Sequence, residues 1–138
     1  MDCIFCKIGK HEIPSHIVYE DEQALAFLDI RPHAEGHTVI IPKKHVANIL
    51  DLEDALVAPT FLTVKQVSAI LNTALNSDGF TIGINHGRIS GQEIDHLHIH
   101  VIPRFLNDNG ASIQSVVNNP SQESLTQIAI KIKKTKSV

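Results

Sequence analysis

The heptapeptide His96-Leu97-His98-Ile99-His100-Val101-Ile102 decides the fold of this chain. Imidazole and apolar side chains alternate along it, which predicts a β-strand that we expect to run over residues 96–103. Successive side chains of a strand point to opposite faces, so the three imidazoles would line one face about 6 to 7 Å apart, with the alternate residues facing the core. Three successive histidines on one face indicate a functional site, because a merely solvated face would accept Lys, Thr or Glu equally well.

Two kinds of chemistry use such a row of imidazoles. Three histidines can hold a catalytic zinc ion, or one imidazole can act as a nucleophile while its neighbours orient it or bind an anion. The outer two histidines are spread about 13 Å apart along a strand, which makes a zinc site of all three awkward. The spacing therefore favours nucleophilic attack, with phosphorus as the expected electrophile and flanking groups holding its anionic oxygens.

The composition is that of a folded protein with one domain. The chain has 138 residues, 43% of them apolar and 20% charged, which excludes intrinsic disorder and predicts a single domain over residues 1–138. A net charge of -3 argues against a nucleic-acid partner. The sequence has no uninterrupted apolar run of about 18 residues and no signal-peptide pattern, so we expect a cytoplasmic protein without a membrane partner.

The remaining segments predict an α+β domain built on an antiparallel sheet. Helical spacing predicts one main helix over about residues 60–76, after a kink or break at Pro59, with Asp51 at the N-cap position and Ser77-Asp78-Gly79 as the stop. A C-terminal helix is expected over residues 121–134. Dimerisation commonly covers the edges of so small a sheet, so we expect a homodimer. The five predicted strands span residues 15–19, 24–28, 37–41, 80–85 and 96–103.

Five blocks of the sequence resemble one known family. They are IFCKI (4–8), YEDEQALAFLDI (19–30), GHTVIIPKKH (36–45), INHG (84–87) and GQEIDHLHIHVIPR (91–104). The last block resembles the His-φ-His-φ-His-φ-φ signature of the histidine triad (HIT) superfamily, and the chain is similar to the bacterial form of its Hint branch, the nucleoside phosphoramidate hydrolases. The motif-bearing part spans about residues 3–105, followed by a tail and helix over 106–138. The resemblance implies the HIT-like fold.

The resemblance implies a two-step displacement at the α-phosphorus of a nucleotide. His98 matches the nucleophile, which would form a nucleotidyl-imidazole that water hydrolyses, and its other ring nitrogen would donate to a backbone carbonyl of the motif. His96 and His100 complete the catalytic triad, with His100 matching a phosphate contact. Loop capping is an ordinary alternative for Asn85, and a surface position is one for Gln92. The implied phosphate-binding residues are Asn85, Gln92, His98 and His100.

The resemblance also implies a nucleoside site of apolar side chains and one carboxylate. Asp29 would accept the ribose hydroxyls, and His37 would support the site by hydrogen bonding. Core packing explains each apolar residue equally well, and turn capping is the alternative for Asp29. A preference for purines rests on the resemblance alone, because apolar walls select for shape. The implied nucleoside-binding residues are Ile4, Phe5, Ile8, Phe27, Asp29, Ile30 and His37.

Cys3 and Cys6 form a Cys-x-x-Cys pair, which by itself is compatible with a redox pair, half of a zinc site or two unrelated thiols. Many bacterial members of the family resemble this chain in combining such a pair with histidines at the positions of His45 and His96. The resemblance therefore implies a structural zinc ion bound by Cys3, Cys6, His45 and His96. Such a zinc would contribute far more to stability than to chemistry, and no organic cofactor is expected.

The expected activity is hydrolysis of a nucleoside 5'-phosphoramidate or acyl-nucleotide, with release of the nucleoside monophosphate. Two alternatives remain open: a dinucleoside polyphosphate hydrolase or nucleotidyl transferase, and a zinc-stabilised nucleotide-binding or scaffold protein with vestigial activity. The sequence departs from the Hint pattern at Glu93, where eukaryotic members usually have Ser or Thr. An ionised Glu can only accept hydrogen bonds, so this difference concerns the choice of leaving group. The histidines that match no functional position are His11, His16, His33 and His86.

Overall fold

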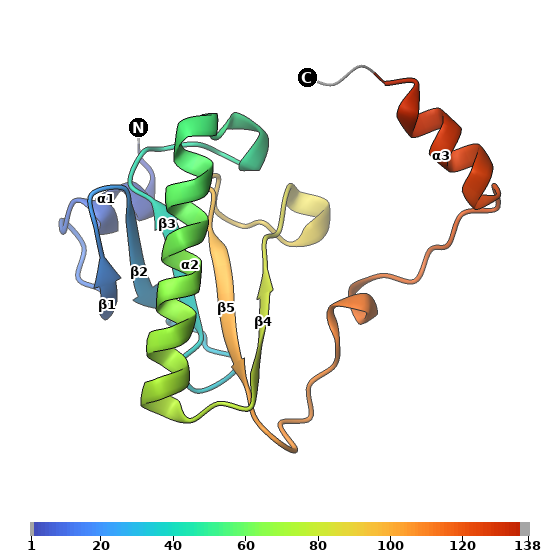
Figure 1. The fold of residues 1–138 in the computed structure, drawn as a ribbon. Coiled ribbons are helices and arrows are strands. Elements are labelled where there is room, and N and C mark those ends of the chain that lie inside the picture. Colours follow the sequence, from blue (N-terminus) through green and yellow to red (C-terminus); the bar gives the residue numbers. More distant parts are fainter. Residues whose placement is uncertain (1, 136–138) are drawn as a thin grey trace.

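The structure is a computed structural model that describes residues 2–135. Its five strands form one antiparallel sheet in the order β1-β2-β3-β5-β4, and helix α2 crosses one face of that sheet (Figure 1). The predicted α+β class and the antiparallel sheet are confirmed. The strands are β1 (Ile17–Glu20), β2 (Ala24–Leu28), β3 (Thr38–Pro42), β4 (Gly79–Gly83) and β5 (Ile99–Arg104), and the α-helices are α1 (Ile4–Gly9), α2 (Asp54–Leu75) and α3 (Leu125–Lys133).

The central strands bury apolar side chains on both faces. On one face they pack against α2, in a cluster of Ala24, Ala26, Ile40, Val64, Val67, Leu71, Ile99 and Val101. On the other face the alternate residues pack against Ile8 of α1, a short helix that the sequence did not predict, in a cluster with Leu25, Phe27, Val39 and Ile41. Burial on both faces explains why β2 and β3 are nearly continuous apolar runs.

Helix α2 begins earlier than the sequence predicts. The expected break at Pro59 is wrong, because Pro59 lies inside the continuous helix, near its N-terminal end. Proline in a helix interior costs roughly 3 kcal/mol, since its nitrogen cannot donate to the preceding turn. Burial of Val64, Val67 and Leu71 against the sheet offsets that cost, because tertiary packing of one face supplies most of the stability of a helix.

The predicted ends of α2 also shift. Asp51 does not cap α2; it ends the short 3-10 helix η1 (Ile49–Asp51), and the N-cap position of α2 is Glu53. At the other end the helix stops at Asn76, which adopts the left-handed conformation with φ 52°. Asparagine tolerates this conformation, so the stop comes just before the predicted Ser77-Asp78-Gly79.

Helix α2 carries more apolar surface than the sheet covers. Within residues 2–135 it is the one helix long and apolar enough to cross a membrane by length and composition alone. Its buried stripe packs against the sheet, which is the position of a core helix. Its outward face leaves Phe61, Leu62 and Ile70 between 41% and 53% exposed.

The histidine motif enters the sheet later than the sequence predicts. Strand β5 begins at Ile99, so His100 is the one histidine of the three that lies in the strand. The preceding segment leaves the ladder because the N–H of Leu97 donates to the carbonyl of Val46 at 2.7 Å, in the loop after β3. The alternation of faces nevertheless persists, since Leu97 and Ile99 are both buried in apolar clusters.

After β5 the chain leaves the sheet, and α3 stands clear of it (Figure 1). Arg104 holds the first turn after β5, over residues 105–111. It donates to the Asp108 carboxylate at 2.6 and 3.0 Å and to the carbonyl of Ala111 at 2.8 Å. Helix α3 lies within the predicted range 121–134 and begins with a capping box between Ser124 and Gln127. Its apolar side chains are largely exposed.

Candidate active site and metal centre

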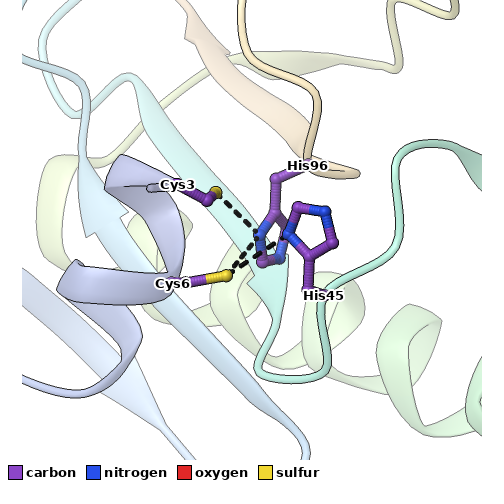
Figure 2. Close-up of side chains that lie close together, drawn as sticks. All are labelled: Cys3, Cys6, His45 and His96. Atoms are coloured by element: carbon purple, nitrogen blue, oxygen red, sulfur yellow. Dashed lines mark hydrogen bonds between the residues drawn. The ribbon is translucent and has the colours of Figure 1, made fainter. Parts of the chain in front are cut away.

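Two cysteines and two histidines from separate segments meet beside α1 (Figure 2). Cys3 precedes α1, Cys6 lies in it, His45 follows β3 and His96 precedes β5. The Sγ atom of Cys6 is 3.3 Å from Nδ1 of His45 and 3.6 Å from Nδ1 of His96, and Sγ of Cys3 is 3.5 Å from the same His96 nitrogen. The four ligand-type atoms lie within 4.8 Å of one another. The structure thus brings together the four residues predicted to bind zinc.

The donor set fits a structural zinc ion. Nε2 of His96 donates to the carbonyl of Pro42 at 2.8 Å, which leaves the lone pair on Nδ1, the nitrogen that faces the sulfurs. Metal-binding histidines commonly have their tautomer fixed by such a second hydrogen bond. Burial and then the neighbouring Cys3 raise the pKa of the Cys6 thiol, so a bound cation would favour its thiolate form. Two thiolates and two imidazoles form the closed tetrahedral set of structural zinc sites.

His98 has the hydrogen bond expected of a nucleophilic imidazole. Its Nδ1 donates to the backbone carbonyl of His96 at 2.7 Å, which puts the lone pair on Nε2. His98 is only 7% exposed, and the ring of Phe5 lies edge-on to its ring with centroids 5.2 Å apart. A nearly buried ring held in one tautomer is organised in advance for attack.

A chain of hydrogen bonds fixes the tautomers of His37 and His100. The backbone N–H of His33 donates to Nδ1 of His37 at 3.1 Å, so the proton of the His37 ring is on Nε2. That Nε2 donates to Nδ1 of His100 at 2.9 Å, which leaves the proton of the His100 ring on its own Nε2.

Both of these rings are neutral near pH 7. Burial lowers the pKa of His37, and burial followed by the nearby His98 and His37 lowers the pKa of His100 to about 4. The ring centroids of His98 and His100 are 5.1 Å apart. His100 is therefore an uncharged N–H donor beside His98, the predicted nucleophile.

Asp29 lies beside His37 without forming a second metal site. Its Oδ1 accepts from the backbone N–H of Arg31 at 2.8 Å, which is the turn-capping contact, and its Oδ2 is 3.7 Å from Nε2 of His37. Asp29, His37 and His100 do bring three ligand-type atoms within 4.8 Å. A metal does not fit there, because Nε2 of His37 carries a proton and Nδ1 already accepts from His33. The contact of Asp29 with ribose hydroxyls stays a prediction.

The Gln92 side chain is engaged by the loops around it. Its Oε1 accepts from the N–H of Gly87 at 2.8 Å, and its Nε2 donates to the carbonyls of Ala47 at 2.7 Å and Ile94 at 3.1 Å. The predicted phosphate contact of Gln92 would require one of these bonds to open. By contrast, among residues 2–135 no hydrogen bond uses the Asn85 side chain, so its amide is available for the predicted phosphate contact.

The apolar residues predicted to hold the nucleoside divide into two groups. Ile8 and Phe27 are buried in the core, and Phe5 packs against Phe27 with ring centroids 5.6 Å apart, so core packing accounts for this group. Ile4 and Ile30 are 45% and 87% exposed, which makes them available to a base.

Sequence reasoning missed three contributors to this region. The backbone N–H of His33 and the carbonyl of Pro42 set imidazole tautomers, and side-chain patterns give no signal for backbone contacts. The third is Arg31, whose Nη2 lies 3.2 Å from Oε2 of Glu93, the position where the sequence departs from the Hint pattern. This ion pair joins two exposed side chains.

The fold and these imidazoles define a protein of the histidine triad class, and comparisons with known proteins agree. The HIT domain family matches residues 10–107. The chain is 40% identical to adenosine 5'-monophosphoramidase HNT1 of Saccharomyces cerevisiae over 121 residues, which are 88% of this chain and 72% of the yeast protein. The chain belongs to the HIT family, which confirms the resemblance found in the sequence.

Solved structures support the same assignment. A HIT family member from Bacillus subtilis matches with a TM-score of 0.87 and 36% identity, over 100% of this chain and 99% of that one. A Zn-bound histidine triad family protein from Mycobacterium smegmatis matches with a TM-score of 0.76 and 37% identity, over 80% and 81% of the two chains. The HIT fold predicted for this chain is confirmed.

Proposed function

We propose that this protein hydrolyses nucleoside 5'-phosphoramidates or acyl-nucleotides at the α-phosphorus and releases the nucleoside monophosphate. The observation that carries the proposal is the 2.7 Å hydrogen bond from Nδ1 of His98 to the carbonyl of His96, because it leaves an unprotonated Nε2 on a nearly buried ring. The activity in the name of the yeast relative supports the same substrate class.

In the first step Nε2 of His98 attacks phosphorus, and a P–N bond forms as the bond to the leaving group breaks. A leaving amine takes up a proton from solvent. The imidazole then carries a positive charge, which the carbonyl of His96 stabilises through the Nδ1–H bond. Nε2–H of His100 donates to a phosphoryl oxygen, where negative charge accumulates in the transition state. In the second step water attacks phosphorus, and the P–N bond breaks with return of its electron pair to Nε2 of His98. The proton of the attacking water passes to solvent.

The nucleoside end of the site follows from the groups that remain available. The Asp29 carboxylate accepts the ribose hydroxyls, and the exposed side chains of Ile4 and Ile30 contact the base. The Asn85 amide donates to the phosphate. A purine is the proposed base.

The proposal includes a structural zinc ion at Cys3, Cys6, His45 and His96. Its support is the convergence of four ligand atoms and the Zn-bound relative from Mycobacterium smegmatis. When bound, zinc supplies the positive charge that keeps both thiols ionised. Metal analysis of protein purified without a metal-binding tag tests this, and protein without zinc would contradict it.

The proposal also includes a homodimer. β1 and β4 are the edge strands of the sheet, and the outward face of α2 exposes Phe61, Leu62 and Ile70. Association commonly covers unpaired strand edges and exposed apolar helix faces. Sedimentation velocity on the protein and on an Ile70→Glu variant tests this assignment, and a monomeric wild type would contradict it.

The decisive experiment is single-turnover hydrolysis of adenosine 5'-phosphoramidate, with chromatographic detection of the monophosphate. His98→Asn removes the nucleophile and is expected to abolish release, whereas the exposed His16→Asn is the matched control. Equal release by wild type and His98→Asn would overturn the proposal. A parallel assay with a dinucleoside polyphosphate distinguishes the proposed activity from that of a dinucleoside polyphosphate hydrolase. Nucleotide binding without turnover would indicate a binding protein.

A further inference from the structure

The metal centre and the His98 nucleophile share their supporting residues. His96 offers Nδ1 to the metal centre and its backbone carbonyl to Nδ1 of His98. Phe5 lies between the two cysteines in the sequence, and its ring is edge-on to His98 at 5.2 Å and to His96 at 6.0 Å between centroids. Two of the contacts that hold the nucleophilic ring therefore arise from the segments that the metal centre joins.

The peptide unit between His96 and Leu97, whose carbonyl accepts from His98, has a second connection to the metal centre. The same peptide carries the N–H of Leu97, which donates to the carbonyl of Val46 at 2.7 Å. Val46 directly follows His45, a proposed metal ligand. Leu97 lies ahead of strand β5, outside the hydrogen-bond ladder of the sheet. Two supports of the His98 ring, the carbonyl of His96 and the ring of Phe5, thus come from a metal ligand and from the neighbour of one.

We propose that Phe5 and His96 are positioning residues through which the metal centre orients His98 for attack. The inference rests on the proposed role of His98 as nucleophile. It revises the sequence-based expectation that this centre serves stability far more than chemistry.

Without ligation these groups keep fewer contacts, namely the packing of Phe5 against Phe27 and the bond from the N–H of Leu97 to Val46. Helix α1 has six residues, and its N-cap Cys3 makes no side-chain capping bond, so the helix depends on tertiary contacts. Its one buried residue is Ile8, at the end far from Cys3. The His96 ring would keep its bond to Pro42 at Nε2, while its Nδ1 would be left with the weak thiol contacts of Cys3 and Cys6 at 3.5 and 3.6 Å. Phe5 and the carbonyl of His96 would then be held more loosely than in the metal-bound protein.

The expected consequence is a loss of kcat that is larger than any rise in KM. A displacement of a reacting group by about 1 Å can cost on the order of a hundredfold in rate, so we expect kcat to fall roughly ten- to a hundredfold. The proposed ribose contact, Asp29, lies in the loop between β2 and β3, outside the segments that carry the metal ligands, so this part of nucleotide binding should persist. Ile4, the proposed base contact in α1, would move with that helix.

The experiment compares Phe5→Ala, Phe5→Tyr and Ile13→Ala in the zinc-loaded protein, together with wild type after chelation. Ile13 is the matched control, because it packs in the same apolar cluster as Phe5. Measurements are kcat and KM for adenosine 5'-phosphoramidate, thermal stability, and the ¹⁵N shifts of His98, which report which ring nitrogen carries the proton.

We expect Phe5→Ala and the chelated protein to lose kcat and to show mixed His98 tautomers. Phe5→Tyr should restore both properties, and Ile13→Ala should lose stability alone. If the folded Phe5→Ala and chelated proteins keep wild-type kcat and a single Nδ1–H tautomer, the inference is wrong; if chelation unfolds the chain, the Phe5 variants decide. A wild type that shows the single tautomer without turnover would instead overturn the proposed function.

Discussion

The buried ring of His100 makes the stability of this protein depend on pH. Desolvation, followed by the neighbouring His98 and His37, lowers its pKa to about 4 in the folded state. In the unfolded chain a histidine titrates near 6.5. Between these two values the unfolded state binds more protons, so this contribution to stability is present above about pH 6.5 and is lost as the pH falls toward 4.

The size of the effect follows from these two pKa values. Between about pH 7 and pH 5.5, linkage gives a loss of about 1.2 kcal/mol in the free energy of unfolding for one such group, and the partial exposure of the ring reduces this to roughly 1 kcal/mol. Urea unfolding at both pH values measures it in wild type and in His100→Gln, which cannot titrate. The variant should lose about 1 kcal/mol less than wild type over this range.

The control is His16→Gln, because His16 is exposed and should leave the wild-type pH dependence unchanged. Protonation of the metal ligands affects all three proteins alike and cancels in the difference. Equal losses of stability in wild type and His100→Gln would refute the reasoning, since the His100 ring would then not be held neutral by its surroundings.

Three further predictions concern backbone, metal and loop. Gly36→Ala should destabilise the fold by roughly 2 kcal/mol in urea unfolding, because Gly36 has φ +77° and the added Cβ would lie 2.2 Å from Cδ1 of Leu75. Gly79→Ala is the control, because a Cβ added there would have no neighbouring atom within 4 Å. Chelation should lower the melting temperature of wild type but not of a Cys3→Ser, Cys6→Ser double variant. Gln92→Ala leaves partly buried backbone groups without their partner and should cost about 1 kcal/mol in thermal unfolding, and Gln92→Glu, which lacks the N–H donors, should not restore it.

Local periodicity predicted the elements of the fold well, and tertiary packing explains where it failed. A short apolar run located β2 over the predicted residues 24–28, because its side chains meet packed layers on both faces. Pro59 was expected to kink or break the helix, and only the contact of α2 with the sheet shows why the helix continues through it. The start of β5 shifted because Leu97 donates to Val46, a partner about fifty residues earlier that no local pattern reveals.

The site was predictable in its side chains and unpredictable in its hydrogen bonds. Motif positions identified Cys3, Cys6, His45 and His96, which the structure brings together. The tautomers depend instead on backbone groups such as the N–H of His33, and every residue type except proline supplies one. Such contacts depend on how loops are placed in three dimensions, so the sequence alone cannot specify them.

The position of β5 has a consequence for folding kinetics. β5 enters the sheet between β3 and β4, and it pairs Thr38 with Val101 and Val39 with His100, partners more than sixty residues apart in the chain. Such non-local pairing is slow, because the entropy of closing a long loop is lost before the contacts are gained. His100 belongs to this pairing and His98 immediately precedes it. A refolding chain therefore brings together the imidazoles of the proposed active site in the same late step that completes its core.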